Sequence, residues 1–319
     1  MSKRIQKCIC VFLVLLTVVS LTAAANAGTT AQAKTPVDEN KECSLSVTYS
    51  SHGLVFENLD VKLYKVAEMS SDYKYTLCGG FEKYRVELNG VKESTEWQEI
   101  NQTLNGYITA DDVKPTAEQK TNEKGKVIFG GLSCGMYLLS EEKVTKDSSE
   151  YTFESFMVSL PSVNEDGTWN YNVSAEPKAD KKTPEKPTKD KIKYTVVKTW
   201  KDIGNTDKRP QSIKVEIFKD GKTQKTETLS SKNDWSYTWE TENDGSKWTV
   251  VERDVPSGYT VSVTQKGKSF SVVNRYPGSS GNPKTGDSTK MTLYIILMGA
   301  AGAALIAVGV INRKRTTKN

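Results

Sequence analysis

The sequence contains very little histidine and cysteine, the residues from which most zinc sites and many catalytic centres are built. There are one histidine and five cysteines in 319 residues. His52 stands in a Ser-Ser-His-Gly turn, and a Ser-His-Asp triad would depend on that single side chain. Cys43, Cys78 and Cys134 are scattered and lack the paired spacing of a zinc site. We therefore expect no metal, no cofactor and no enzyme that turns over an external substrate.

The net positive charge of the sequence comes from the two ends of the chain. The formal net charge is +5, of which Lys3, Arg4 and Lys7 contribute +3 and residues 286–319 contribute +4. Residues 28–285 therefore carry about −2. The basic ends indicate membrane targeting, and nothing in the remaining charge indicates a nucleic-acid partner.

The N-terminus has the pattern of a secretory signal peptide. An apolar run from Cys8 to Ala25 follows the basic residues, and Ala25-Asn26-Ala27 supplies a small-residue cleavage site. We expect cleavage after Ala27, with residues 31–33 as the second choice, and an exported protein. Three cysteines then remain. One disulfide plus a free thiol and three buried free thiols are both compatible with this number, and the sequence does not choose a pair.

The C-terminus has three parts in order. Asn282-Pro283-Lys284-Thr285-Gly286 precedes the uncharged run Met291–Ile311, and a basic tail occupies residues 312–319. The run has 21 residues and would span about 30 Å as a helix, enough for one bilayer crossing, with the tail in the cytoplasm. This order resembles the cell-wall sorting signal of Gram-positive surface proteins, with Asn282 where that family usually has Leu. The resemblance implies that a sortase cuts between Thr285 and Gly286 and joins Thr285 to an amine of peptidoglycan or another subunit. A plain transmembrane anchor is the alternative.

Strand-like alternation fills the rest of the chain and predicts an all-β protein of two β-sandwich domains. The composition divides the chain as follows: signal peptide 1–27, flexible segment 28–42, first sandwich 43–178, Pro/Lys-rich linker 179–192, second sandwich 193–276 and sorting signal 277–319.

The first domain is expected to contain a helix among its strands. Apolar residues recur at helical spacing between Thr95 and Ile108, with Thr95 as the cap and Gln98 as its capping-box partner. The expected strands are 44–49, 59–66, 126–129, 135–141, 151–160 and 169–175.

The second domain is expected to consist of seven strands. They are 194–200, 213–219, 223–229, 235–240, 248–253, 259–265 and 269–274, with a hairpin turn at Asp220-Gly221.

Three segments of the second domain resemble a Cna B-type domain: Val196 to Trp200, Trp248 to Tyr259 and Phe270 to Tyr276. Members of that family join a first-strand Lys to a last-strand Asn through an isopeptide bond, helped by a carboxylic acid. The resemblance places the Lys at Lys198, the Asn at Asn274 and the acid at Glu252. Lys198 alternates with Val196 and Trp200 on one strand face, which favours its burial. Burial would keep the amine neutral and the acid protonated, as the reaction requires.

The first domain repeats this pattern only in part. The spacing from Tyr137 to Glu141 parallels that from Trp248 to Glu252, but the first strand has no Lys. Lys41 or Lys62 would have to serve, with Asn170 or Asn172 as acceptor. A solvated or hydrogen-bonded Glu141 is the simpler interpretation.

The end of the first domain resembles the pilin motif of sortase-assembled pili. Trp169, Val173, Pro177 and Lys178 fit that motif, whereas Ala175 and Glu176 depart from its usual Val and Tyr. The resemblance implies that Lys178 attacks the sortase-bound Thr285 of another subunit. A last strand with a core Trp, followed by a Lys-rich linker, is the simpler alternative.

The sequence therefore predicts an exported protein of the Gram-positive cell wall that passes through a single-pass membrane precursor. A sortase-polymerised pilus subunit is the preferred interpretation. The alternatives are a monomeric adhesin that binds a host or matrix ligand through residues 81–117, and an inert stalk.

Overall fold

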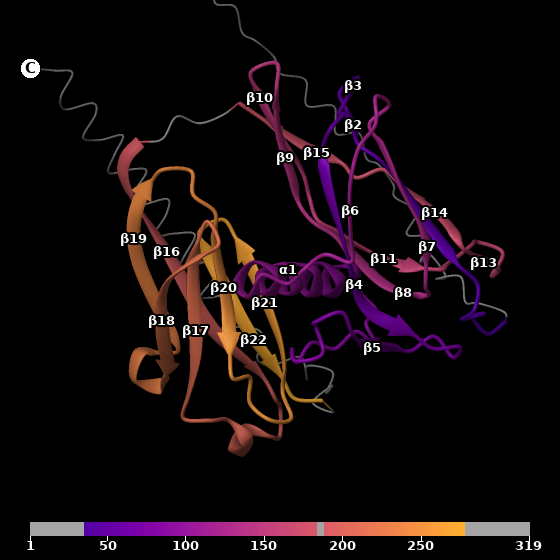
Figure 1. Cartoon of the computed structure of the whole chain (residues 1–319). Helices are drawn as coiled ribbons and strands as arrows, with labels where there is room; N and C mark the ends of the chain where they lie inside the picture. Colours follow the sequence, from indigo (N-terminus) through magenta and orange to yellow (C-terminus); the bar gives the residue numbers. More distant parts are fainter. Residues whose placement is uncertain (1–34, 184–187, 278–319) are drawn as a thin grey trace, which may run out of the picture.

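The computed structural model describes residues 35–183 and 188–277, which form two β domains side by side with one helix between them (Figure 1). The expected signal peptide, with its cleavage after Ala27, lies outside the described residues, as do the pentad 282–286, the apolar run 291–311 and the tail 312–319. Within the described ranges, no helix is long and apolar enough to cross a membrane.

The second domain is a sandwich of a four-stranded sheet, in the order β19-β16-β22-β21, and a three-stranded sheet, in the order β18-β17-β20. The seven expected strands are confirmed, with shifts of at most three residues at their ends except at the start of β16, which begins at Thr188 and not at Tyr194. Their bounds are β16 (Thr188–Lys201), β17 (Ser212–Lys219), β18 (Lys222–Ser230), β19 (Ser236–Asn243), β20 (Trp248–Arg253), β21 (Thr260–Lys266) and β22 (Ser269–Arg275). Asp220 and Gly221 both have positive φ and form the expected hairpin turn between β17 and β18.

The first domain is also a β-sandwich. Its main sheets have the orders β14-β1-β7 and β11-β8-β4-β5, and β6 joins the second sheet through β4. The strands are β1 (Cys43–Thr48), β2 (Ser50–Ser51), β3 (Leu54–Val55), β4 (Asp60–Met69), β5 (Tyr75–Leu77), β6 (Ala117–Lys120), β7 (Lys126–Leu132), β8 (Gly135–Leu139), β9 (Glu142–Lys146), β10 (Ser149–Phe153), β11 (Phe156–Leu160), β12 (Ser162–Val163), β13 (Trp169–Asn170), β14 (Asn172–Ala175) and β15 (Ala179–Lys182).

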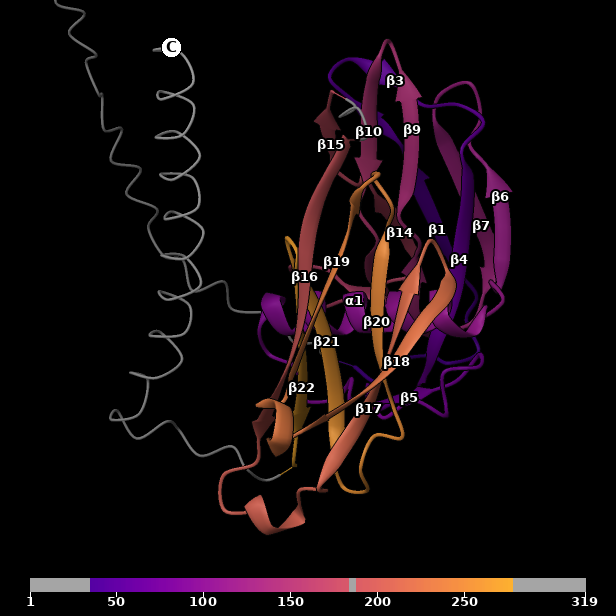
Figure 2. The same ribbon diagram turned by 90° about the vertical axis from the view of Figure 1, so that its left-hand side faces the viewer.

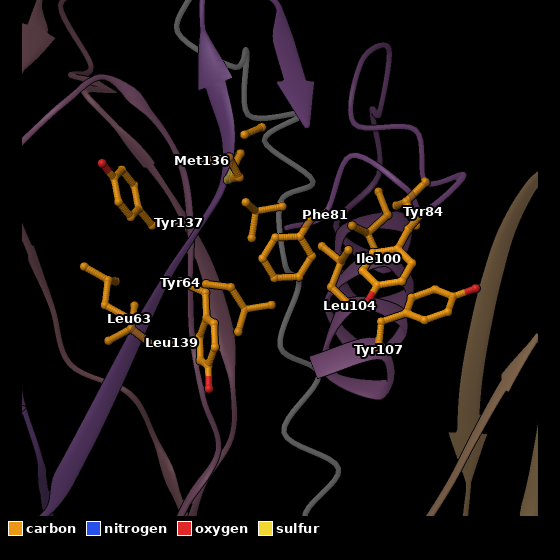
Figure 3. Close-up of a cluster of buried hydrophobic side chains, with 14 of the residues drawn as sticks. Leu63, Tyr64, Phe81, Tyr84, Ile100, Leu104, Tyr107, Met136, Tyr137 and Leu139 are labelled. Carbon is orange, nitrogen blue, oxygen red and sulfur yellow. The ribbon is translucent and has the colours of Figure 1, made fainter. Parts of the chain in front are cut away.

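The expected helix is confirmed as α1 (Ser94–Asp111), but its cap is not the expected one. The N-cap is Glu93 rather than Thr95, and the Glu93 backbone N–H donates to Glu96 Oε2 at 3.3 Å. Ile100 and Leu104 of α1 pack with residues of the first domain's sheet (Figure 3). The helix is therefore an integral part of the first domain's core.

The expected flexible segments are partly ordered, which corrects two predictions. Val37, in the segment 28–42, is buried and its N–H donates to Ser71 O at 3.1 Å. In the expected linker 179–192, β15 pairs with β10, and β16 begins at Thr188 and pairs with β19. Polar, Lys-rich residues suit the edges of sheets, where long side chains reach solvent while the backbone pairs. Strands β15 and β16 therefore occupy much of the segment expected to be a Pro/Lys-rich linker.

Candidate functional site

Three charged or polar residues meet between the two sheets of the second domain. Lys198 on β16 and Asn274 on β22 come from neighbouring parallel strands, and Glu252 is on β20 of the opposite sheet. The register pairs Trp200 with Asn274, and Lys198 shares the face of Trp200 because side chains alternate along a strand. The Lys and the Asn therefore point into the core from the same face.

Glu252 contacts both partners. Its Oε2 lies 3.5 Å from Lys198 Nζ, and its Oε1 accepts a 2.8 Å hydrogen bond from Asn274 Nδ2. The side chains of Lys198 and Glu252 are 0% exposed, and Asn274 is also 0% exposed. The predicted burial of Lys198 is thus confirmed, and the structure brings together the three residues that the resemblance named.

Burial sets the protonation of this group of three. Removal from water lowers the pKa of Lys198 to about 8 and raises the pKa of Glu252. The opposite charge of the partner counteracts both shifts, but desolvation is the larger cause in each case. Both shifts favour the uncharged forms, a neutral amine beside a protonated carboxyl.

The site also carries buried acceptor atoms that receive no hydrogen bond within the described part of the chain. Glu252 Oε2 and Asn274 Oδ1 are buried and accept no hydrogen bond from the described residues. Buried polar atoms in this state are costly, and native structures contain few of them. The three side chains therefore leave acceptor capacity unused inside the core.

Aromatic and charged neighbours cover the amine, and sequence reasoning did not assign them this role. Lys198 Nζ lies 4.2 Å from the centroid of the Trp200 ring, and the Arg209 guanidinium lies 5.7 Å from the same ring. Arg209 binds Asp202 with two hydrogen bonds of 2.7 and 2.6 Å, and Tyr259 donates to Asp202 at 2.9 Å. Trp200 follows Lys198 by two positions, so both side chains lie on one face of the strand. This spacing could have identified Trp200 as the residue whose ring shields the amine.

Helix α1 of the first domain closes the open side of the second sandwich, between edge strands β20 and β21 (Figure 2). Three backbone N–H groups on the free edge of β21 donate to the first domain: Val261 to Arg85 O at 2.8 Å, Val263 to Thr103 Oγ1 at 2.8 Å and Gln265 to Gln102 Oε1 at 3.0 Å. These backbone donors, which pair with no neighbouring strand in the described ranges, are thereby hydrogen-bonded. This contact also buries both faces of β20, the strand that carries Glu252.

Lys178 occupies a very different environment. It is exposed, in the short segment between β14 and β15, and lines a groove of about 1420 Å³ between the domains. Within the same motif, Val173 is buried, whereas Trp169 is half-buried and donates from Nε1 to Thr35 O at 2.8 Å. The amine of Lys178 is accessible, and its expected partner Thr285 lies outside the described residues.

Two residues of the partial pattern in the first domain have other partners. Glu141 forms an ion pair with Lys247 at 2.9 Å across the domain interface. Asn172 is exposed and accepts a hydrogen bond from Ser44 at 2.8 Å. Glu141 is therefore a hydrogen-bonded surface carboxylate, the simpler of the two sequence interpretations.

Comparisons with known proteins assign a family to the second domain. Residues 194–275 match the family model described as the Cna protein B-type domain, so the second domain is a Cna B-type domain. The chain is also 30% identical to the collagen adhesin of Staphylococcus aureus. That match covers 61% of this chain and 19% of the adhesin, so the chain spans about a fifth of that protein's length.

Solved structures with similar chains include a single B repeat unit of the collagen-binding surface protein of Staphylococcus aureus. It is 20% identical, with a TM-score of 0.26, and the match covers 74% of this chain and 98% of that one. The full-length major pilin SpaD from Corynebacterium diphtheriae is 14% identical, with a TM-score of 0.27, and the match covers 70% and 90% of the two chains.

Proposed function

We propose, from the Cna B-type domain at residues 194–275, that this chain is a structural protein of the Gram-positive cell surface. In this proposal a sortase polymerises it into a pilus, and an isopeptide bond between Lys198 and Asn274 stabilises it. The observation that carries the proposal is the buried contact of Lys198, Glu252 and Asn274.

The bond would form by one intramolecular substitution. Neutral Lys198 Nζ attacks Asn274 Cγ, the Nζ–Cγ bond forms and the Cγ–Nδ2 bond breaks. The Glu252 carboxyl polarises the amide, takes the proton from Nζ and delivers one to Nδ2, which leaves as ammonia. Folding holds the reactants together, so the step needs no encounter between molecules. Each chain reacts once, which makes the step maturation and not turnover.

The position of the bond supports a mechanical role. β16 and β22 are the first and last strands of the second domain, and they lie side by side in parallel. A bond between them would connect the chain's entry into the domain directly to its exit. Tension applied along the chain would then pass through covalent bonds and would not separate the strands.

Polymerisation would use Lys178 of one subunit and Thr285 of the next. The exposure of Lys178 supports this part of the proposal, because a sortase must bring its acyl-bound Thr285 to a free amine. Release of the sortase thiol and formation of a Lys178–Thr285 amide would link the two copies.

Co-expression of the full chain with a pilus sortase tests the polymerisation. We expect a ladder of high-mass species on denaturing gels that disappears in Lys178→Ala. Lys182→Ala is the matched control, because Lys182 is also exposed and lies on β15 just after the motif, and it should retain the ladder. A single species, or a ladder unchanged by Lys178→Ala, would contradict polymerisation through this residue.

A monomeric adhesin is the second candidate, and the groove between the domains favours it. Trp97, Asn101 and Asn105 of α1 line this groove, within the segment 81–117 expected to contact a ligand. The relative in Staphylococcus aureus is a collagen adhesin, so collagen is the probe to use. Saturable collagen binding that is lost in Trp97→Ala would support this candidate, and absence of binding would remove it.

A further inference from the structure

Two of the three cysteines in the described ranges meet in the first domain. Cys43 Sγ and Cys134 Sγ lie 4.0 Å apart, although the residues are 91 positions apart in the chain. The residues are 2% and 3% exposed. Cys43 opens β1, opposite Leu132 of β7, and Cys134 lies in the turn that joins β7 to β8.

The polar groups next to the two sulfurs, among the described residues, belong to the backbone. The hydrogen-bonding neighbours of the thiols, besides each other, are the backbone carbonyls of Asp38 and Lys41. Within residues 35–183 and 188–277, no group of His, Cys, Asp and Glu side chains is arranged to hold a metal ion. Cys78 is half-buried and directs its thiol to Lys65 O, 3.9 Å away.

We propose that Cys43 and Cys134 form a disulfide bond and that Cys78 remains a free thiol. An external disulfide of the glutathione or thiol-oxidoreductase class is the oxidant. One cysteine thiolate attacks this disulfide to give a mixed disulfide, and the other cysteine displaces the second oxidant thiolate. Two electrons pass to the oxidant, which leaves as two thiols, and the Sγ–Sγ bond forms.

The bond forms while the chain folds. Burial raises the pKa of Cys43 to about 12 and also raises the pKa of Cys134, so both thiols are poor nucleophiles once folded. Because both residues are buried, reductants have little access to the finished bond.

The disulfide gives the first domain a covalent tie of its own. β1 pairs in parallel with β14, the strand that leads towards Lys178. Tension on Lys178 would load β14 and then β1, which the disulfide attaches to the β7–β8 turn. This role rests on the proposed polymerisation through Lys178, but it does not depend on the isopeptide bond of the second domain.

Tryptic mapping of the full chain tests the proposal. The chain is refolded from denaturant with oxidised glutathione, alkylated in denaturant and digested without reduction. Trypsin places Cys43, Cys78 and Cys134 on three different peptides, bounded by Lys41 and Lys62, Lys74 and Lys83, and Lys126 and Lys143. We expect the first and third peptides to be joined, two hydrogens lighter than their sum, and the Cys78 peptide to be alkylated.

Cys78→Ser is the matched control and should give the same joined pair. Refolding in reductant instead of oxidised glutathione should lower the thermal midpoint of the wild type and of Cys78→Ser, but not that of the Cys43→Ala/Cys134→Ala double variant. Alkylation of all three peptides, or a bond that includes Cys78, would overturn the proposal.

Discussion

The hydroxyl of Tyr107 on α1 donates a 2.9 Å hydrogen bond to the backbone carbonyl of Glu252 on β20. A side chain of the first domain thus donates to the backbone of Glu252, whose carboxyl lies beside Lys198 in the second domain. Tyr107 is buried and stacks on Tyr84, with ring centroids 4.0 Å apart. The stacking on Tyr84 fixes the Tyr107 ring in the position that makes this hydrogen bond. The two domains therefore share one packed interface.

Replacement of Tyr107 by Phe should destabilise this interface. The ring would keep its packing, but the buried carbonyl of Glu252 would lose its partner. The expected loss is about 1–3 kcal/mol in the free energy of unfolding, the cost of an unsatisfied buried group. Urea unfolding measures it, with Tyr73→Phe as a control because Tyr73 is 45% exposed and lies outside this interface. Equal midpoints for Tyr107→Phe and the wild type would show that the hydrogen bond does not contribute.

Gly106 sets how closely α1 approaches β20. A Cβ at this position would lie 3.4 Å from Val251 Cγ1 and 3.6 Å from Val250 O. Gly106→Ala should therefore be tolerated, and Gly106→Leu should separate the domains because its longer side chain has no space. Small-angle X-ray scattering should show a larger radius of gyration for Gly106→Leu alone. An unchanged radius in that variant would contradict the packing described.

Glu142 should make the first domain less stable as pH rises. Burial raises its pKa from 4.5 to about 7, against the hydrogen bond from Ser140 that lowers it. Between these pH values the folded protein holds a proton that the unfolded chain has lost, so stability falls as pH rises through this window. The free energy of unfolding of Glu142→Gln should therefore exceed that of the wild type by about 1–2 kcal/mol above pH 7 and should equal it near pH 4. This figure is reduced because the carboxyl is partly exposed and therefore screened by solvent.

The thermal midpoint of Glu142→Gln, measured from pH 4 to pH 8, checks this dependence. Glu118→Gln is the control, because Glu118 is exposed on β6. A difference from the wild type that is constant with pH would contradict the assignment to Glu142.

Loss of the proposed Lys198–Asn274 bond should strongly destabilise the second domain. Lys198→Met replaces the amine with an apolar side chain of similar length and leaves Glu252 and Asn274 hydrogen-bonded. If the loop-entropy relation for disulfides applies to this bond, the variant should lose about 4–5 kcal/mol in the free energy of unfolding. Denaturant titration measures this loss, and an unchanged midpoint would indicate that the wild type carries no cross-link.

Much of the second domain could be predicted because its strands alternate regularly. Val196, Lys198 and Trp200 share one face, and this pattern alone predicted the burial of Lys198. The resemblance to a family then supplied Glu252 and Asn274, which strand alternation could not have paired across two sheets. The Asp220-Gly221 turn was equally readable, since both residues tolerate positive φ.

The failures came where tertiary context overrides local pattern. β15 looked like a linker because Lys181 and its neighbours are polar, yet it pairs with β10 at a sheet edge, where Lys181 Nζ lies 5.4 Å from the Tyr151 ring centroid. The helix cap moved from Thr95 to Glu93 because Glu96 supplies the matching acceptor. The contact of Tyr107 with Glu252 joins residues 145 positions apart, and no local pattern encodes it.

The measurement that tests the account most directly is the mass of the tryptic peptides that contain Lys198 and Asn274, taken from the folded full chain. The account predicts one joined species, lighter by one ammonia than the sum of its two parts and uncleaved after Lys198. Lys198→Met and Glu252→Gln should both give an unlinked Asn274 peptide of unmodified mass. Two separate, unmodified peptides from the wild-type chain would contradict the isopeptide bond.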